Sequence, residues 1–296
     1  MSDDVSEATA AASVAEAAPP ANPPVVWLNL SCLDAPIVAV TWQWLFAYVF
    51  GAHLTPALRA LLFLTAWLIS LADRFADTIK LAPESPISLR HRFCREHIIG
   101  WWVAVVVIFC LDVGLALRSL DLQMLLLGGT LALLCFGYLF VNHWLGGRWR
   151  PVPMKEKSIG VLFAAGTTLA VIAQLPRLTA SFAAAVILFA ILCAFNCLSI
   201  AAWERQLDAA QGKTSLLTGW PALAGSLKLI GYALAVAALC CAIVWTPALP
   251  LWLSLAASAF LLVRLNAAAN LPRDSRTAWA DLVLLTPLLA LLLSLR

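Results

Sequence analysis

The sequence predicts an all-α membrane protein, a polytopic helical bundle of about nine transmembrane helices, and three observations support this fold class. Hydrophobic residues make up 62% of the 296 residues and charged residues only 12%, about half the share of a soluble domain. The apolar residues form runs of roughly the length that an α-helix needs to cross a bilayer. The runs are continuous rather than alternating, which excludes a transmembrane β-barrel.

Residues 1–24 differ from the rest of the chain in composition. They are rich in Ala, Pro, Ser and acidic residues and contain neither Lys nor Arg. A secretory signal begins with basic residues and has an apolar centre, so this segment is not one. Its low hydrophobicity predicts a disordered cytoplasmic tail, and residues 25–296 are expected to form one transmembrane domain.

The apolar runs then follow one another along the chain. We expect helices over residues 35–51, 55–77, 97–118, 121–141, 157–174, 180–204, 223–246, 249–265 and 277–295. The first and the eighth are short. A bundle of eight helices with one re-entrant or interfacial segment is therefore the alternative count.

The loop charges predict the orientation of the bundle. Most of the 19 Lys and Arg residues fall on one side, and only Arg59, Arg118, Arg177 and Arg296 fall on the other. Basic loops stay in the cytoplasm, so the N-terminus is expected inside a cell inner or plasma membrane. The longer polar loops lie on the same side, which favours a cytoplasmic working site. The net charge of +3 is too small to indicate a nucleic-acid partner.

Two of the predicted helices end in the same pattern on the cytoplasmic side. One ends with Ala-Asp-Arg-Phe-Ala-Asp over residues 72–77, and the other with Glu-Arg-Gln-Leu-Asp over residues 204–208. Helix positions i and i+4 share one face. Each helix is therefore expected to present a pair of carboxylates, and we call these pairs the first and the second motif.

The four carboxylates predict a bound cation, because they would otherwise repel one another where the helix ends meet. They are Asp73, Asp77, Glu204 and Asp208. Mg²⁺ fits this setting because it takes oxygen ligands and bridges carboxylates to substrate phosphates. Nearby basic side chains would neutralise the remaining phosphate charge, and the candidates are Arg74, Lys80, Lys157 and Arg205. The pattern predicts a magnesium-diphosphate site below an apolar interior that takes a long hydrocarbon.

These motifs resemble those of the intramembrane UbiA-type prenyltransferases. The first motif of that family, N-D-x-x-D-x-x-x-D, often continues as A-D-R-x-x-D, which residues 72–77 match. The second can read Y-D, six residues, D-R-x-x-D and then a Gly and a Lys, and residues 196–213 follow that spacing. The family also has a Lys shortly before a Gly-containing helix, as residues 155–160 do.

The resemblance implies a Mg²⁺-dependent transfer of a prenyl group from a prenyl diphosphate to a hydrophobic or aromatic acceptor. Asp73, Asp77, Glu204 and Asp208 would be the catalytic and metal-binding residues. The substrate-binding residues would be Arg74, Lys80, Lys157, Asn196, Arg205 and Lys213. The basic loop over residues 88–93 is similar to the family segment that closes over the site.

The sequence departs from the family pattern at a few positions. Ile69 and Ser70 stand where the family has its leading Asn-Asp, Cys197 stands for an Asp, and Glu204 replaces another. Two other functions therefore stay open. One is a relative without catalysis that binds a lipid diphosphate or a partner protein. The other, less favoured, is a transporter, which would place its charges nearer the middle of the membrane.

Several of these residues also have simpler interpretations. Arg74 and Arg205 can pair with neighbouring acids on their own helices, and Lys155 with Lys157 can anchor a helix on the cytoplasmic side. Asn196 can join two helices by a hydrogen bond. Gly160 and Gly166 indicate a close helix contact rather than a ligand-binding loop.

Overall fold

A computed structural model describes residues 24–82, 84–145, 155–211, 217, 220, 222–268 and 270–294. Within these residues helices are the only regular secondary structure, which confirms the all-α class for this part of the chain. The tail predicted for residues 1–24 lies outside the described residues up to position 23, and so does Lys213.

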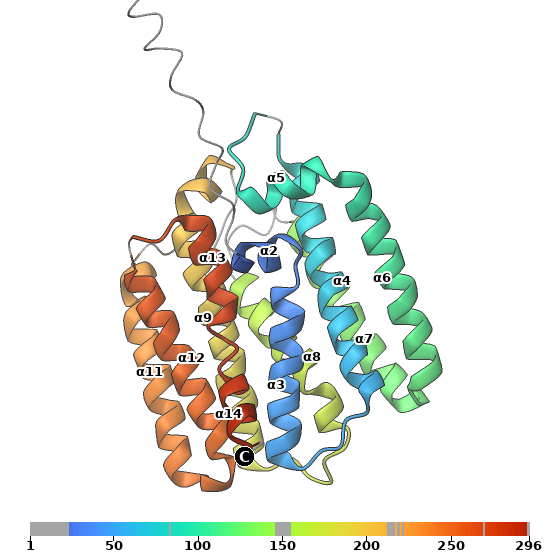
Figure 1. The fold of residues 1–296 in the computed structure, drawn as a ribbon, viewed down its shortest axis with the longest axis vertical. Coiled ribbons are helices and arrows are strands. Elements are labelled where there is room, and N and C mark those ends of the chain that lie inside the picture. The colour runs from blue at the N-terminus through green and yellow to red at the C-terminus, as the bar shows by residue number, and fades with distance from the viewer. Residues whose placement is uncertain are drawn as a thin grey trace, which may run out of the picture.

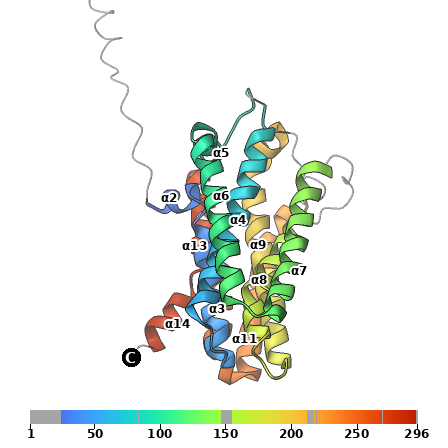
Figure 2. The same ribbon diagram turned by 90° about the vertical axis from the view of Figure 1, so that its right-hand side faces the viewer.

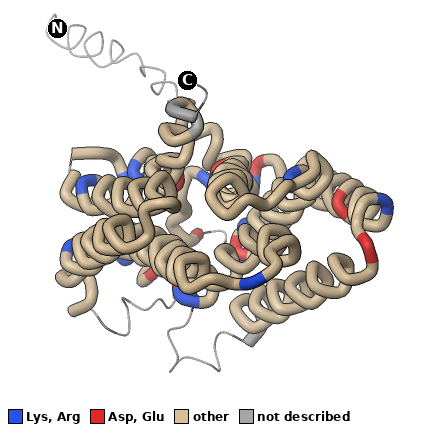
Figure 3. Tube along the Cα trace, turned by 90° about the horizontal axis from the view of Figure 1, so that it is seen from below, with Lys and Arg blue, Asp and Glu red and all other residues tan. Residues whose placement is uncertain are grey.

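The long helices stand side by side as a bundle (Figure 1). They are α3 (Asp34–Phe50), α4 (Pro56–Lys80), α6 (Ile98–Ser119), α7 (Leu122–Phe140), α8 (Lys155–Ile172), α9 (Ala180–Ala210), α11 (Leu223–Val244) and α12 (Leu249–Ala267). Each corresponds to one of the predicted apolar runs. Seen along the bundle, most of every helix carries uncharged residues (Figure 3), in keeping with the low charged content.

Length and composition make this a helical membrane protein. Among the described residues, six helices are long and apolar enough to cross a bilayer: α4, α6, α7 with its following turn, α9, α11, and α12 with its preceding turn. A seventh span results if α2 (Pro24–Leu30) and α3, which meet at 93°, are counted as one. Helix α8 is not one of these six. It stands in the bundle, but its first three residues, at positions 155–157, are charged.

The last apolar run is not the single helix that was predicted over residues 277–295. It forms α13 (Arg273–Leu282) and α14 (Pro287–Ser294), which are 10 and 8 residues long. The physical reason is Pro287, which lacks an N–H and clashes with the preceding helical turn. Pro also disfavours the helical conformation in the residue before it, so the chain breaks ahead of Pro287 and starts a new helix there.

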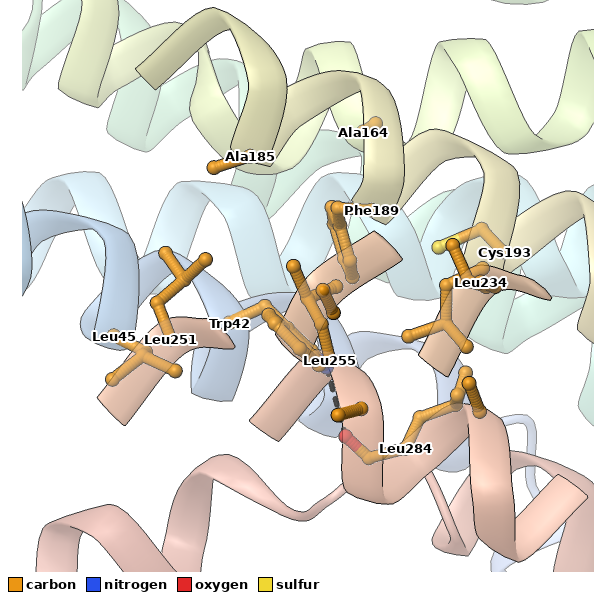
Figure 4. Close-up of a cluster of buried hydrophobic side chains, with 14 of the residues drawn as sticks. Trp42, Leu45, Ala164, Ala185, Phe189, Cys193, Leu234, Leu251, Leu255 and Leu284 are labelled. Atoms are coloured by element: carbon orange, nitrogen blue, oxygen red, sulfur yellow. Dashed lines mark hydrogen bonds between the residues drawn. The ribbon is translucent and has the colours of Figure 1, made fainter. Parts of the chain in front are cut away.

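Side chains of two other helices satisfy the backbone groups that this break exposes. The Trp42 indole N–H donates to the Leu284 carbonyl at 2.8 Å, a contact drawn in Figure 4. The Ser258 hydroxyl donates to the Val283 carbonyl at 3.0 Å. Buried carbonyls without partners are costly, so α3 and α12 fix the position of the break.

The largest core cluster fills the bundle between α3, α8, α9 and α12 with side chains. Trp42 and Phe189 are fully buried with ring centroids 4.6 Å apart, and Phe46 packs edge-on against Phe189 at 5.7 Å. Ala164 and Leu255 are buried in the same cluster (Figure 4). This region is occupied by the protein's own side chains, which pack α8 and α9 against α3 and α12.

Helices α8 and α9 approach so closely that their contact needs a glycine. A Cβ atom added at Gly160 would lie 2.5 Å from the Ala190 carbonyl oxygen and 2.8 Å from the Ala194 nitrogen. At Gly166 the nearest atom, of Leu131, would be an ordinary 3.8 Å away. The predicted close contact is therefore confirmed for Gly160 but not for Gly166. It places the second turn of α8 against the middle of α9.

Two short helices cover the end of the bundle where the motifs lie, α2 and α5 (Leu89–Glu96), as Figures 1 and 2 show. The Arg74 guanidinium donates to the Asn29 carbonyl at the end of α2. The Trp67 indole N–H donates to the Ser31 carbonyl at 2.9 Å. These bonds give the carbonyls at the end of α2 additional donors, so α4 holds α2 in place.

Candidate functional site

A cavity of about 170 Å³ lies where the ends of α4, α8 and α9 meet α5. It brings the two carboxylate motifs together. The charged residues that line it are Asp77, Arg90, Lys155, Glu156, Glu204 and Asp208. The structure therefore places one carboxylate of the first motif and both carboxylates of the second motif around one space.

The second motif is held from α5. A nitrogen of the Arg90 guanidinium lies 2.5 Å from a carboxylate oxygen of Glu204, whose side chain is only 7% exposed. Burial of Arg90 lowers its pKa, but the charges of Glu204 and Asp77, with smaller contributions from other carboxylates, raise it above the usual value. Arg90 is therefore a permanent cation beside the cavity, and the segment that was expected to be a basic loop over the site is largely helical, as α5.

Lys155 supplies a second permanent cation, from the first residue of α8. Burial lowers the pKa of its ammonium, but the nearby carboxylates of Asp73, Asp77 and Asp208 raise it above the usual value. Within the described residues the ammonium makes no hydrogen bond or ion pair. A charged side chain that faces a cavity without a partner is suited to an anionic ligand.

The first motif is held from the end of α7, where the chain continues as a π-helical turn, η1 (Val141–Leu145). One ring nitrogen of His143 lies 2.9 Å from an oxygen of Asp73, and the other lies 3.4 Å from an oxygen of Asp77. The His143 side chain is 4% exposed. Sequence reasoning missed this residue, and the only available signal was a histidine at the cytoplasmic end of a predicted helix.

Three predicted substrate-binding residues have protein partners in the structure. Arg74 donates to the end of α2, and Lys80 donates to the backbone carbonyl of His143. The Asn196 amide donates to Asp281 at 2.7 Å, which matches its simpler interpretation as a link between helices. None of the three lines the cavity, so their contact with a substrate stays a prediction.

Two of the other predicted substrate-binding residues, Lys157 and Arg205, do not line the cavity. Lys157 and Arg205 have exposed side chains, while Lys213 lies outside the described residues. Lys155, two positions before Lys157, lines the cavity instead. The basic groups that the structure brings to the motifs are thus Lys155 and Arg90.

The cavity offers the donor chemistry of a Mg²⁺ site. Four carboxylates line it against two permanent cations, and carboxylate oxygens are the ligands that Mg²⁺ prefers. The described residues contain no group of three or more His, Cys, Asp or Glu side chains already arranged around a metal position. Asp77, Glu204 and Asp208 are the residues that would hold the ion.

Comparisons of the chain with protein-family models, with curated proteins and with solved structures give no match. The function is therefore inferred from the cavity and its residues, together with the motifs described above.

Proposed function

We propose that the chain is a UbiA-like integral membrane protein that binds Mg²⁺ and a prenyl diphosphate at this cavity and transfers the prenyl group to an aromatic or lipid acceptor. The observation that carries the proposal is the meeting of the two motifs in one cavity, at the ends of two long apolar helices. Helices α3 and α8 and the α13–α14 pair would complete a bundle of nine membrane segments, with the cavity on the cytoplasmic side.

The charge of the cavity supports the requirement for a cation. Its carboxylates outnumber its permanent cations, so a diphosphate would be repelled unless a metal ion accompanied it. Arg90 and Lys155 would then bind the phosphate oxygens, the guanidinium as a planar fork and the ammonium as a point charge. The absence of another partner for Lys155 within the described residues supports this assignment.

The size of the cavity supports a division of the ligand into two parts. About 170 Å³ is smaller than the roughly 300–1,000 Å³ of pockets that enclose whole drug-sized ligands. The diphosphate and its cation would fill the polar space. The hydrocarbon chain would extend from the cavity along apolar helix surfaces, beginning at Ile159 and Ile200, which line the cavity.

Prenyl transfer breaks the bond between the allylic carbon and the diphosphate oxygen, and the electron pair leaves with the diphosphate. Arg90 and Lys155 would stabilise that leaving group, and bound Mg²⁺ would neutralise further charge on it. The apolar side chains of Ile159, Ile200 and Leu207 would keep water from the allylic cation. The acceptor then forms the new carbon bond and loses a proton.

The protein partners of both motifs favour a second candidate, a non-catalytic protein that binds a lipid diphosphate. Arg90 already neutralises Glu204, and His143 already contacts Asp73 and Asp77. If these pairs persist with ligand bound, few carboxylate oxygens are left for a metal, and binding would not depend on Mg²⁺.

Binding of farnesyl diphosphate to the purified protein in detergent, with Mg²⁺ or with EDTA, tests both candidates. We expect binding that needs Mg²⁺ and that weakens about tenfold or more in Asp77→Asn and Glu204→Gln. Loss of a charge-assisted hydrogen bond costs about 1.5–3 kcal/mol, so Lys155→Met should lower the affinity about ten- to a hundredfold. Lys157→Met, whose side chain is exposed, is the matched control and should bind like the wild type.

The outcomes separate the candidates. Equal binding with Mg²⁺ and with EDTA would favour the non-catalytic protein. An absence of binding to farnesyl diphosphate and to shorter or longer prenyl diphosphates would refute the proposed site. If binding needs Mg²⁺, a scan of radiolabelled transfer to aromatic and lipid acceptors should follow.

A further inference from the structure

The first motif is joined to a different helix through one side chain. The His143 ring lies between Asp73 and Asp77, 2.9 Å from one carboxylate and 3.4 Å from the other. Asp77 lines the cavity, whereas His143 does not. Any effect of His143 on a ligand in the cavity would therefore pass through the carboxylates.

The π-helical turn that carries His143 is itself attached to α4. Lys80, one turn beyond the motif, donates to the His143 backbone carbonyl and lies 5.8 Å from the centre of the Trp144 ring. Both the backbone and the ring of His143 are thus held by the last turns of α4. A π-turn shifts the side chains after it relative to a continuous α-helix, and such turns are frequent at functional sites.

The two residues that stand about one turn before Asp73 on α4 offer the carboxylates no donor. Ile69 is apolar, and the Ser70 hydroxyl donates to the Ala66 carbonyl of the same helix at 2.9 Å. Two aspartates one turn apart repel each other. A ring that contacts both carboxylates restricts their rotation, and it comes from the η1 turn after α7 rather than from α4.

We propose that His143 is a positioning residue that holds Asp73 and Asp77 in one orientation for the ligand in the cavity. The proposal rests on the proposed function, because it concerns how the first motif binds Mg²⁺ and a prenyl diphosphate. Carboxylates must be held in place to bind a metal ion well, and residues that orient ligands commonly change metal affinity tenfold or more. His143 would thereby take over support that Ile69 and Ser70 do not give.

A double-mutant cycle on the full chain tests this role. Affinity for farnesyl diphosphate with Mg²⁺ is measured after His143→Leu in three backgrounds: wild type, Asp77→Asn and Glu204→Gln. We expect His143→Leu to weaken binding about tenfold in the wild type and in Glu204→Gln, but by less than about twofold in Asp77→Asn. Coupling is expected only between residues that act through each other.

Two further variants keep the test decisive. His143→Gln retains a donor for one carboxylate and should restore part of the affinity, also where His143→Leu does not fold. His97→Leu removes a histidine whose ring nitrogen contacts only the local Phe93 carbonyl, and it should bind like the wild type.

The results distinguish the two proposals. A wild type that binds no prenyl diphosphate overturns the proposed function and the role of His143 with it. A wild type that binds, together with a His143→Leu variant of equal affinity, overturns the positioning role alone. An equal loss in all three backgrounds also overturns it, because a merely structural change would weaken binding regardless of Asp77.

Discussion

Replacing Gly160 by Ala should disturb the fold and the cavity together. The new methyl group would lie 2.5 Å from the Ala190 carbonyl oxygen, 2.8 Å from the Ala194 nitrogen and 2.9 Å from the Ala194 methyl group. Two of these atoms belong to the backbone of α9 and cannot turn away as a side chain would. The helices must therefore separate by roughly 1 Å to reach normal contact distances of about 3.5–4.0 Å.

The expected cost follows from two opposing effects. Overpacking of a well-packed contact costs about 1–3 kcal/mol, and the change from Gly to Ala returns up to about 1 kcal/mol through helix propensity. We expect a net loss of about 1–2 kcal/mol. Because Lys155 lies little more than one turn before Gly160, the same displacement should move its ammonium relative to Glu204 and weaken ligand binding.

The assay is thermal unfolding of the purified protein in detergent, followed by farnesyl diphosphate binding at a temperature where both proteins are folded. Gly166→Ala on the same helix is the matched control, since its new methyl group would meet only Leu131 at 3.8 Å. The control should be as stable as the wild type or more stable. Equal melting temperatures for Gly160→Ala and Gly166→Ala would refute the close approach of α8 and α9.

Three further predictions follow from single contacts. Trp42→Phe leaves the Leu284 carbonyl without its donor, so chemical denaturation should show a loss of about 1–3 kcal/mol, and an unchanged stability would contradict the role of this bond. Arg90→Gln leaves the buried carboxylate of Glu204 without its cation; the melting temperature should fall, and restoration by Glu204→Gln in the double variant would identify the pair as the cause. The pKa of Lys155 is raised above 10.5, so its contribution to stability is fully present below that pH and is lost as the pH rises through the higher folded pKa. The difference in melting temperature between the wild type and Lys155→Met should stay constant from about pH 6 to 9. A decrease of this difference within that range would contradict the raised pKa of Lys155.

The long helices could be predicted because the lipid phase imposes one simple condition, an apolar run of sufficient length. The break before Pro287 shows where this condition is insufficient. The surrounding run is mostly apolar, but the proline removes a hydrogen bond and interrupts the helix. The break also needs partners from Trp42 and Ser258, and those contacts depend on tertiary packing.

The orientation of the helices predicted that the two motifs would meet. It did not predict which basic residues would line the cavity beside them. Lys155 lines the cavity, whereas Lys157 is exposed. Two residues along a helix are about 200° apart around its axis, so the two lysines face nearly opposite directions. The contact at Gly160 sets the rotation of α8. The sequence indicated a close contact at this glycine, but not which side of α8 would face the cavity.

Arg74 illustrates a second limit. Its position inside the first motif suggested a phosphate ligand, but the structure directs its guanidinium to the Asn29 carbonyl. Residues 24–30 were not expected to be helical, so the carbonyls at the end of α2 were not expected to need a donor. Arg90 and His143 were likewise beyond sequence reasoning in detail, because short helices and π-turns lack a hydrophobic period that fixes their direction.

The burial of the second motif argues against the simplest alternative, in which these acids only mark polar helix ends at the membrane surface. A carboxylate that serves as a polar helix end gains by facing water and needs no partner. Glu204 is only 6% exposed, and burying a charged carboxylate is costly unless it is paired. For Glu204 the chain meets this cost with Arg90 on α5, and Lys155 at the start of α8 adds positive charge beside the same cavity. Such an arrangement is expected where a site needs acids and bases together, as a metal-diphosphate site does.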